Sequence, residues 1–500
     1  MPKYLIRGGR LPYQKVPVEN YLDANMFGNN TGNYMYLNAI LRTLMTDENT
    51  KFVCTNYKRN FSKKEIDQIN AECDGFIIPL ADAFRPDFVD EMKDLTNLVN
   101  KLEIPSYIIG AGIRAGSEEQ FPARHYGFED ETTEFIKAVL KKSACVGVRG
   151  EFTADFLKYL GFKEEEDYRV IGCPSLYTYG NRLHIRETDI TPDFKAACSG
   201  TLTTDMETIQ KMGEYMKEFH DLIFVGQLRR ELKTLYLGVD YKTDEDLTAY
   251  YPCTIHHPLY ANDKVRFFYN TDKWVDFYRD MDFTFGTRFH GVVPSILGGA
   301  PSLLIIKDIR MRELAEFHHL PHVQTIDLNH YKSIWDVIES MDFHSPEAVA
   351  PKNFENYIDF LHLNGFKTIY DENPDRKDAP LDQRIAEADV TPEVTSCVRC
   401  SPEELTERFR NSYEFVVKRQ EQLKTKANKS SAEVKKSNAR VRQLEGEVNR
   451  QKGDVNRLKG EVNRLEGDVS RLSSEIKGKD ALMNRRLVRT AIKIQHKLDR

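Results

Sequence analysis

The sequence predicts an α/β protein with two domains of alternating strands and helices, followed by a C-terminal α-helical coiled coil. Two observations lead to this class. Short apolar runs alternate with amphipathic helical runs through most of residues 1–370, which is typical of parallel sheets covered by helices. From Val441 to Ile476, valine or isoleucine recurs with a period of seven, with leucine three residues later in most repeats, which is typical of a coiled coil. The length of 500 residues also exceeds what one hydrophobic core usually supports.

The amino-terminal domain is expected to span residues 1–185. Residues 25–45 hold a glycine- and asparagine-rich turn that leads into an amphipathic helix. Backbone amides in such a turn approach a substrate closely, because glycine has no side chain. We therefore single out Gly28, Asn29 and Asn33 as candidate substrate-binding residues. A plain loop with a helix cap is the alternative interpretation.

Alternating strands and helices follow this turn. The expected strands are 51–55, 75–79, 106–110 and 144–149, and the expected helices are 90–102, 132–142 and 151–160. Arg149 ends the fourth strand, directly before a helix, and a fifth strand ends at Cys173, Pro174 and Ser175. Because ligands bind at the carboxyl ends of parallel strands, Arg149 and Ser175 are further candidates for substrate binding. A helix-capping role is the alternative for Arg149.

The second domain is expected to span residues 190–370, after a polar, turn-rich hinge at 180–194. Its expected strands are 195–198, 222–225 and 265–269, and its expected helices are 206–220, 228–237, 272–281, 312–317, 333–341 and 354–363. Residues 371–400 are polar and contain prolines, so we interpret them as a linker.

The chain is organised around residues 281–312, MDFTFGTRFHGVVPSILGGAPSLLIIKDIRMR. This segment predicts strand, turn, helix and strand, with the helix beginning near His290, because Pro294 is tolerated only in a first turn. Arg288 and His290 then lie between a strand end and a helix start, where anions bind. Arg310 follows the next strand at the same edge of the sheet. We expect Arg288, His290 and Arg310 to converge on an anion site; a helix cap beside a satisfied polar residue is the alternative.

The carboxyl-terminal part is expected to be a coiled coil at 401–482 and a basic amphipathic tail at 483–500. Valine or isoleucine occupies every seventh position from Val441 to Ile476, with leucine three residues later in most repeats. This pattern favours a parallel homodimer. Residues 485–500 carry six basic residues against Asp499, a pattern that is compatible with peripheral contact with an anionic membrane. A solvated basic helix is the alternative.

Composition narrows the functional classes. The net charge of -6 gives no overall signal for nucleic acid. The sequence shows neither a signal peptide at its start nor an apolar run long enough to span a membrane, so we expect a cytoplasmic protein, at the inner face of the membrane if the tail binds there. Cys397 and Cys400 form a CxxC pair without a second ligand pair nearby, so we expect no metal site, and no cofactor.

Four motifs carry a resemblance to a known family. They are FGNNTGN, VGVRGEFTADFLKYLG, VIGCPS and GTRFHGVVPSILGGAPSLLIIKDIRMREL. With them the chain resembles the polysaccharide pyruvyl transferase family over about residues 20–345. The resemblance implies a fold like that of GT-B glycosyltransferases, with two Rossmann-like halves facing across a cleft. It also implies transfer of a pyruvyl group from phosphoenolpyruvate to two hydroxyls of one sugar in a cell-surface polysaccharide or its precursor. The products are a cyclic ketal and phosphate.

Two positions depart from the family's pattern. Many members carry an acid where this chain has Asn33, and another where it has Gly150. These departures leave the acceptor side and the general base open. Asp23 and Asp308 are candidates for the base.

The residues suit this chemistry independently. Phosphoenolpyruvate carries a carboxylate and a phosphate, and arginine pairs with such groups in a bidentate manner. We therefore assign Arg149, Arg288 and Arg310 to donor binding. Protonation of the enol-ether carbon needs an acid that titrates near neutrality, so we assign His290 as the general acid.

Two other classes of protein remain open at this point. A GT-B glycosyltransferase that uses a nucleotide sugar would share the architecture and the anion site. A non-catalytic scaffold would use the coiled coil as its working part. The acceptor is expected to be a sugar or a lipid-linked glycan, and neither its identity nor its linkage follows from the sequence.

Overall fold

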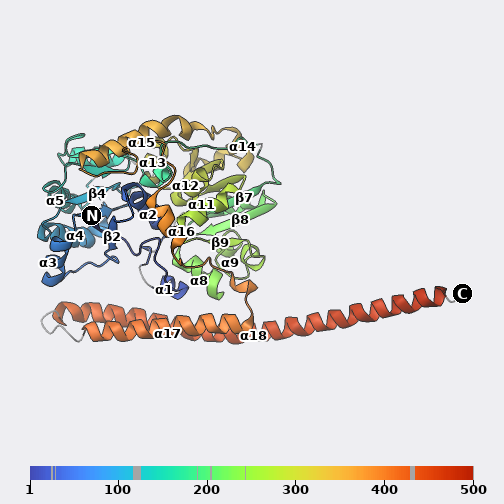
Figure 1. Cartoon of the computed structure of the whole chain (residues 1–500). Helices are drawn as coiled ribbons and strands as arrows, with labels where there is room; N and C mark the ends of the chain where they lie inside the picture. Colours follow the sequence, from blue (N-terminus) through green and yellow to red (C-terminus); the bar gives the residue numbers. More distant parts are fainter. Residues whose placement is uncertain are drawn as a thin grey trace. The chain divides into compact units, whose positions relative to one another are not determined.

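A computed structural model describes residues 1–23, 26–28, 30–115, 125–188, 190–202, 205–242, 244–427 and 434–498. The chain forms two compact units. The first contains residues 1–235 and 240–394, and the second contains residues 236–239 and 395–500. Figure 1 shows the strands of the first unit and the long helices of the second.

The amino-terminal half of the first unit is built on a parallel sheet with the strand order β2-β1-β3-β4. These strands are β1 (Lys3–Ile6), β2 (Lys51–Cys54), β3 (Gly75–Pro79) and β4 (Ser106–Ile109). Their helices are α1 (Val18–Asp23), α2 (Gly32–Leu44), α3 (Lys63–Glu72) and α4 (Val89–Lys101). Strand β1 was not predicted from the sequence; it is a four-residue strand that lies between two neighbours and buries Leu5 and Ile6.

A shorter parallel pair extends this half. It consists of β5 (Val146–Val148) and β6 (Tyr168–Val170), and a bridge between Ala111 and Val148 connects it to the chain after β4. The helices here are α5 (Glu129–Leu140) and α6 (Glu151–Tyr159). The expected fifth strand ends earlier than predicted, because Cys173 precedes a 3₁₀ turn, Pro174–Tyr177.

The second half is built on a six-stranded parallel sheet with the order β12-β11-β10-β7-β8-β9. The strands are β7 (Lys195–Ser199), β8 (Asp221–Gly226), β9 (Val265–Phe267), β10 (Phe283–Gly286), β11 (Ser302–Ile306) and β12 (His322–Gln324). The helices are α7 (Met206–Lys217), α8 (Arg229–Leu237), α9 (Glu245–Thr248), α10 (Pro258–Ala261), α11 (Thr271–Arg279), α12 (Phe289–Leu297), α13 (Ile309–Phe317) and α14 (Ile334–Glu339). The predicted class, two Rossmann-like α/β halves, is confirmed.

The chain then returns from the second half to the first. In α15 (Ser345–Leu363), Asn356 donates a hydrogen bond to the carbonyl of Val170. The segment expected to be a linker contains α16 (Pro380–Glu387), and residues up to 394 belong to the first unit. A bidentate ion pair between Arg42 of α2 and Asp382 of α16 holds this segment in place.

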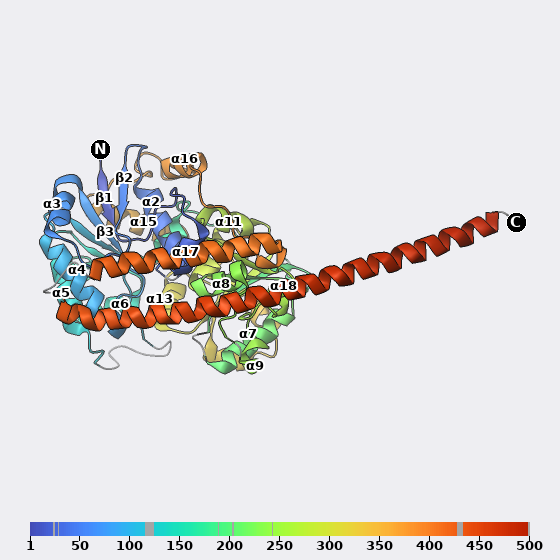
Figure 2. The ribbon, with the colours of Figure 1, turned by 90° about the horizontal axis from the view of Figure 1, so that it is seen from below.

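The second unit consists mainly of α17 (Pro402–Ala427) and α18 (Val434–Leu498). Figures 1 and 2 show α17 alongside the first part of α18, while the rest of α18 extends beyond it. Residues Val455, Leu458, Val462 and Leu465 are partly buried in this hairpin. The structure therefore covers part of the predicted Val/Leu seam with a helix of the same chain. No helix in the described ranges is both long and apolar enough to cross a membrane.

Candidate functional site

The segment that links β10 to α12 lies at the carboxyl edge of the second sheet, as predicted. Arg288 has extended backbone and is the N-cap of α12, which begins at Phe289. The predicted helix start is one residue late, and Pro294 lies in the second turn rather than the first. Since proline has no N–H, the carbonyl of His290 receives no helical hydrogen bond from it.

His290 lies against the loop that precedes α2. A Cβ atom on Gly32 would come within 2.5 Å of Nδ1 of His290, so glycine is required at this close approach. On the other side of the ring, Nε2 is 3.8 Å from Sγ of Cys173, which is itself 2.9 Å from Oγ of Ser175. Both Cys173 and Ser175 are fully buried. Burial, together with the guanidinium groups of Arg149 and Arg310, lowers the pKa of His290 to about 3. His290 is therefore neutral in the free enzyme.

Arg149 approaches His290 from the first half of the protein. Its Nε donates a 2.8 Å hydrogen bond to the carbonyl of Gly110, and its guanidinium lies over the ring of Tyr36. The residue is 2 % exposed, and its Nη2 has no hydrogen-bond partner among the described residues. A buried guanidinium nitrogen without a partner is energetically costly. This nitrogen is therefore suited to receive an anion.

Arg310 also belongs to this cationic group, but it is neutralised in part. It donates hydrogen bonds of 2.8 Å to Asp82 and 2.9 Å to Asp308. Asp82 also pairs with Arg85 and Arg114. Although burial opposes it, these guanidinium groups lower the pKa of Asp82 to about 2. The carboxylate of Asp82 thus forms ion pairs with three arginines, two from the first half of the protein and one from the second half.

Lys307 lies just before Arg310, and burial lowers the pKa of its ammonium to about 8. Asp308 caps α13 by accepting a hydrogen bond from the N–H of Met311. This capping role and its pairing with Arg310 occupy the carboxylate that we considered as a general base.

Arg288 is directed toward the interior of the second half. Its Nε donates to the carbonyl of Gly200, and its Nη2 donates a 3.2 Å hydrogen bond to Glu231, which is 1 % exposed. Glu231 in turn accepts hydrogen bonds from the N–H groups of Gln227 and Leu228. The structure thus brings Arg149, His290 and Arg310 together and engages Arg288 in a buried ion pair beside them. A donor-binding role for Arg288 stays a prediction.

Glu313 is a buried carboxyl that the sequence analysis did not single out. It extends from α13 to the amino end of α6, where it accepts hydrogen bonds from the N–H (3.0 Å) and hydroxyl (2.9 Å) of Thr153. Burial raises its pKa from the ordinary 4.5 to about 7. A Cβ on Gly150 would lie 2.5 Å from Cβ of Glu313. The departure from the family's pattern at Gly150 therefore makes room for this carboxyl.

The predicted residues of the amino-terminal loop have mainly local contacts. Asn33 closes the loop by donating to the carbonyls of Phe27 (2.9 Å) and Gly28 (3.3 Å). Gly28 has a φ of 59° and lies next to Tyr57. Asn29 lies outside the described residues, and Asp23 ends α1 with a side chain that is not described. Substrate binding by Gly28, Asn29 and Asn33 stays a prediction.

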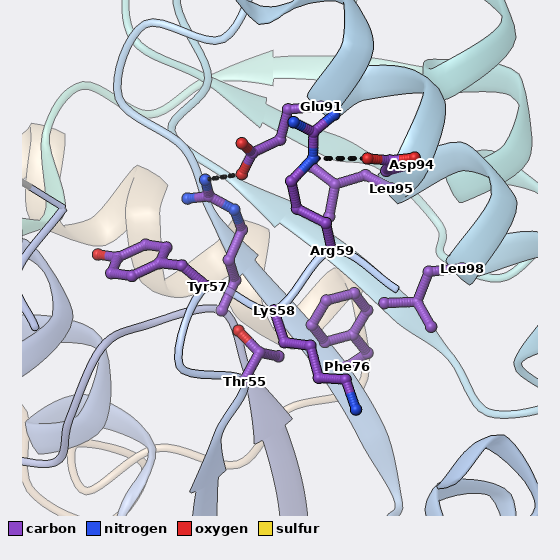
Figure 3. A pocket seen from close by; sticks show the side chains of 10 residues that line it. Thr55, Tyr57, Lys58, Arg59, Phe76, Glu91, Asp94, Leu95 and Leu98 are labelled. Atoms are coloured by element: carbon purple, nitrogen blue, oxygen red, sulfur yellow. Dashed lines mark hydrogen bonds and ion pairs between the residues drawn. The ribbon is translucent and has the colours of Figure 1, made fainter. Parts of the chain in front are cut away.

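A separate pocket lies beside α4, as Figure 3 shows. It opens to solvent, and its empty space together with the adjoining solvent amounts to about 300 Å³. Arg7 pairs with Glu91 at 2.5 Å, and Arg59 pairs with Asp94 at 2.6 Å. Because each guanidinium already has a carboxylate partner, this pocket has less to offer a doubly anionic ligand than the site around Arg149 does.

Cys173 and Asp82 were also missed as members of the site. VIGCPS contains Cys173, but its contact with His290 spans 117 residues of sequence, and Asp82 contacts Arg310 across 228 residues. Within the described part of the chain, no group of His, Cys, Asp or Glu is arranged to hold a metal ion.

Comparison with known proteins yields one family. The model of the polysaccharide pyruvyl transferase family matches residues 30–307, more than half of the chain. No curated protein matches. Two UDP-N-acetylglucosamine 2-epimerases are among the similar solved structures. The one from Neisseria meningitidis is 10 % identical with a TM-score of 0.38, and the match covers 73 % of this chain and 98 % of that one. The putative one from Listeria monocytogenes is 9 % identical with a TM-score of 0.39, covering 73 % and 97 %.

Proposed function

Since the chain belongs to the polysaccharide pyruvyl transferase family, we propose that it transfers the pyruvyl group of phosphoenolpyruvate to two hydroxyls of one sugar. The observation that carries the proposal is the convergence of Arg149, His290 and Arg310, with a buried Nη2 of Arg149 that has no partner in the part of the chain that the structure describes. Phosphoenolpyruvate has a carboxylate and a phosphate, and such a pair of anions needs several fixed cations. A sugar or lipid-linked glycan is the acceptor.

In this proposal, binding of the donor prepares the acid. Free His290 is neutral, because its pKa is about 3. The anionic charges of the donor oppose the effect of Arg149 and Arg310, and they raise the pKa of the imidazole by direct attraction. His290 then takes up a proton when phosphoenolpyruvate is bound. The acid is therefore formed where the substrate is present.

The reaction balances in protons. Imidazolium His290 gives a proton to the methylene carbon of the donor, which becomes a methyl group. The adjacent cationic carbon accepts one sugar hydroxyl, phosphate leaves, and the second hydroxyl closes the ketal. Of the two hydroxyl protons released, one restores His290 and the other leaves with phosphate. Each transfer requires a group with a pKa near the working pH.

The test is incubation of the protein with phosphoenolpyruvate and a panel of lipid-linked glycans. We expect phosphate release and a glycan whose mass has increased by one pyruvyl ketal. His290→Gln should keep donor binding by calorimetry and lower turnover by about 100-fold or more. In parallel, thermal unfolding is measured with phosphoenolpyruvate and with nucleotide sugars. Protection by a nucleotide sugar alone would instead indicate a glycosyltransferase.

The proposal extends to assembly and location. We infer a homodimer formed through the helical second unit, in the cytoplasm. The Val/Leu repeat supports the dimer, although α17 covers part of it within one chain. Light scattering before and after removal of residues 401–500 tests it, because a dimer that persists after the removal would place the contact elsewhere.

A further inference from the structure

The part of α18 that extends beyond α17 presents an uncovered apolar stripe. α17 begins at Pro402, which shares a surface pocket with Glu466 of α18. Before this point the described seam residues Val455, Leu458, Val462 and Leu465 are partly buried, whereas Val469, Leu472 and Ile476 are 40 %, 52 % and 59 % exposed. The seam therefore continues past the end of its partner helix.

The same face continues into the basic tail. Eighteen residues make five turns of an α-helix, so Leu487 lies directly above Val469 and Ile494 lies directly above Ile476. Leu487 and Ile494 are 61 % and 54 % exposed. The helix is continuous from Val434 to Leu498. Apolar residues thus recur along one face of the free helix over about seven turns, with the acidic Asp480 on that face between Ile476 and Leu487.

The opposite face carries positive charge. Arg485, Arg489 and Lys493 are spaced four residues apart and are all exposed. At 100° per residue, Arg489 lies about 200° around the helix from Leu487. Residues 477–500 contain eight lysine and arginine residues and two aspartates. An apolar stripe with an opposite basic face is the pattern of a helix that lies in a membrane surface.

A second copy of the chain fits this stretch less well. Continuation of the Val/Leu heptads places Lys479, Arg486 and Lys493 at the positions that leucine occupies earlier. In a parallel dimer, these like charges would face each other at the seam, which is unfavourable.

We propose that residues 469–498 of α18 dock on an anionic membrane surface, with the stripe of Val469, Ile476, Leu487 and Ile494 against the acyl boundary. The basic face lies beside the headgroups. The inference does not depend on the donor or on the reaction. Where the acceptor is lipid-linked, it gives the enzyme and its acceptor a common surface.

The experiment is sedimentation of the full chain with vesicles of phosphatidylcholine containing one third phosphatidylserine, and with vesicles of pure phosphatidylcholine. We expect binding to the first kind only, and a steep loss of binding with added salt, because salt screens charges at a surface. The triple variant Arg485→Gln, Arg489→Gln and Lys493→Gln should bind about 100-fold more weakly, since each basic residue near an anionic leaflet adds a several-fold gain.

A matched control removes the same charge elsewhere on α18. Arg450→Gln, Arg457→Gln and Arg464→Gln should leave vesicle binding nearly unchanged, because all three residues lie before the proposed docking segment. The variant Leu487→Asp with Ile494→Asp should lose binding while keeping the helical content by circular dichroism. Equal binding to neutral vesicles, equal loss in the two triple variants, or self-association without vesicle binding would each overturn the proposal. Phosphate release without vesicles tests the proposed function separately.

Discussion

Replacement of Gly32 by alanine should move the proposed general acid without touching its chemistry. The new Cβ would lie 2.5 Å from Nδ1 of His290 and 2.6 Å from its Cβ and Cγ. Ordinary contacts between such atoms are about 3.5 Å or longer, so the imidazole and Cβ of His290 must retreat by about 1 Å. Because Cβ itself is too close, a change of rotamer does not relieve the clash. Cys173 limits the retreat on the other side.

A displacement of about 1 Å at a reacting group can lower turnover by about 100-fold. We expect this loss in the initial rate of phosphate release at saturating phosphoenolpyruvate, with little change in the overall fold, since alanine favours the start of α2 more than glycine does. Gly460→Ala is the control, because a Cβ there meets nothing within 4 Å. A Gly32→Ala enzyme that works at the wild-type rate would refute this geometry of His290.

Four further changes test other parts of the structure. Arg149→Lys should weaken phosphoenolpyruvate binding by about 10- to 150-fold in calorimetry, since hydrogen bonds to charged groups contribute about 1.5–3 kcal/mol. Arg288→Lys should instead lower thermal stability more than donor affinity, because Glu231, the partner of Arg288, is buried. The opposite pattern would support the predicted donor-binding role of Arg288. The folded protein binds the Glu313 proton more tightly than the unfolded chain, so this group's contribution to stability is full below pH 4.5 and is lost as the pH rises through about 7. Between pH 5 and 8, the free energy of unfolding of Glu313→Gln should therefore fall less than that of wild type, with a difference of roughly 2–3 kcal/mol in denaturant unfolding. Parallel pH profiles for the two proteins would contradict the raised pKa of Glu313. The helical hairpin should be stabilised by about 1 kcal/mol for each of the changes Gly453→Ala, Gly460→Ala and Gly467→Ala, because a Cβ at each site meets nothing within 4 Å. The triple variant should therefore lose its helix at a higher temperature. An unchanged transition temperature would mean that these helices do not melt as a unit.

Local patterns in the sequence were sufficient to predict the two α/β halves and the strand-to-helix turn that carries His290. Both follow from signals within a few residues, namely apolar runs of strand length and glycines at turns. The four-residue strand β1 was missed because it lacks a local signal of this kind. Its burial comes from the strands on either side of it and not from its own pattern.

The tertiary structure decided how the charged groups are used. Arg149, Arg288 and Arg310 look equivalent in the sequence, since each lies close to a strand end. Only the fold shows that Glu231 pairs with Arg288 and that Asp82 and Asp308 pair with Arg310. It also shows that Nη2 of Arg149 lacks a partner within the described ranges. The Val/Leu repeat likewise specifies an apolar seam but not what covers it, because α17 of the same chain and a second chain bury valine and leucine equally well. Long-range pairing depends on which strand ends meet in space, and that is set by the order of the strands in each sheet.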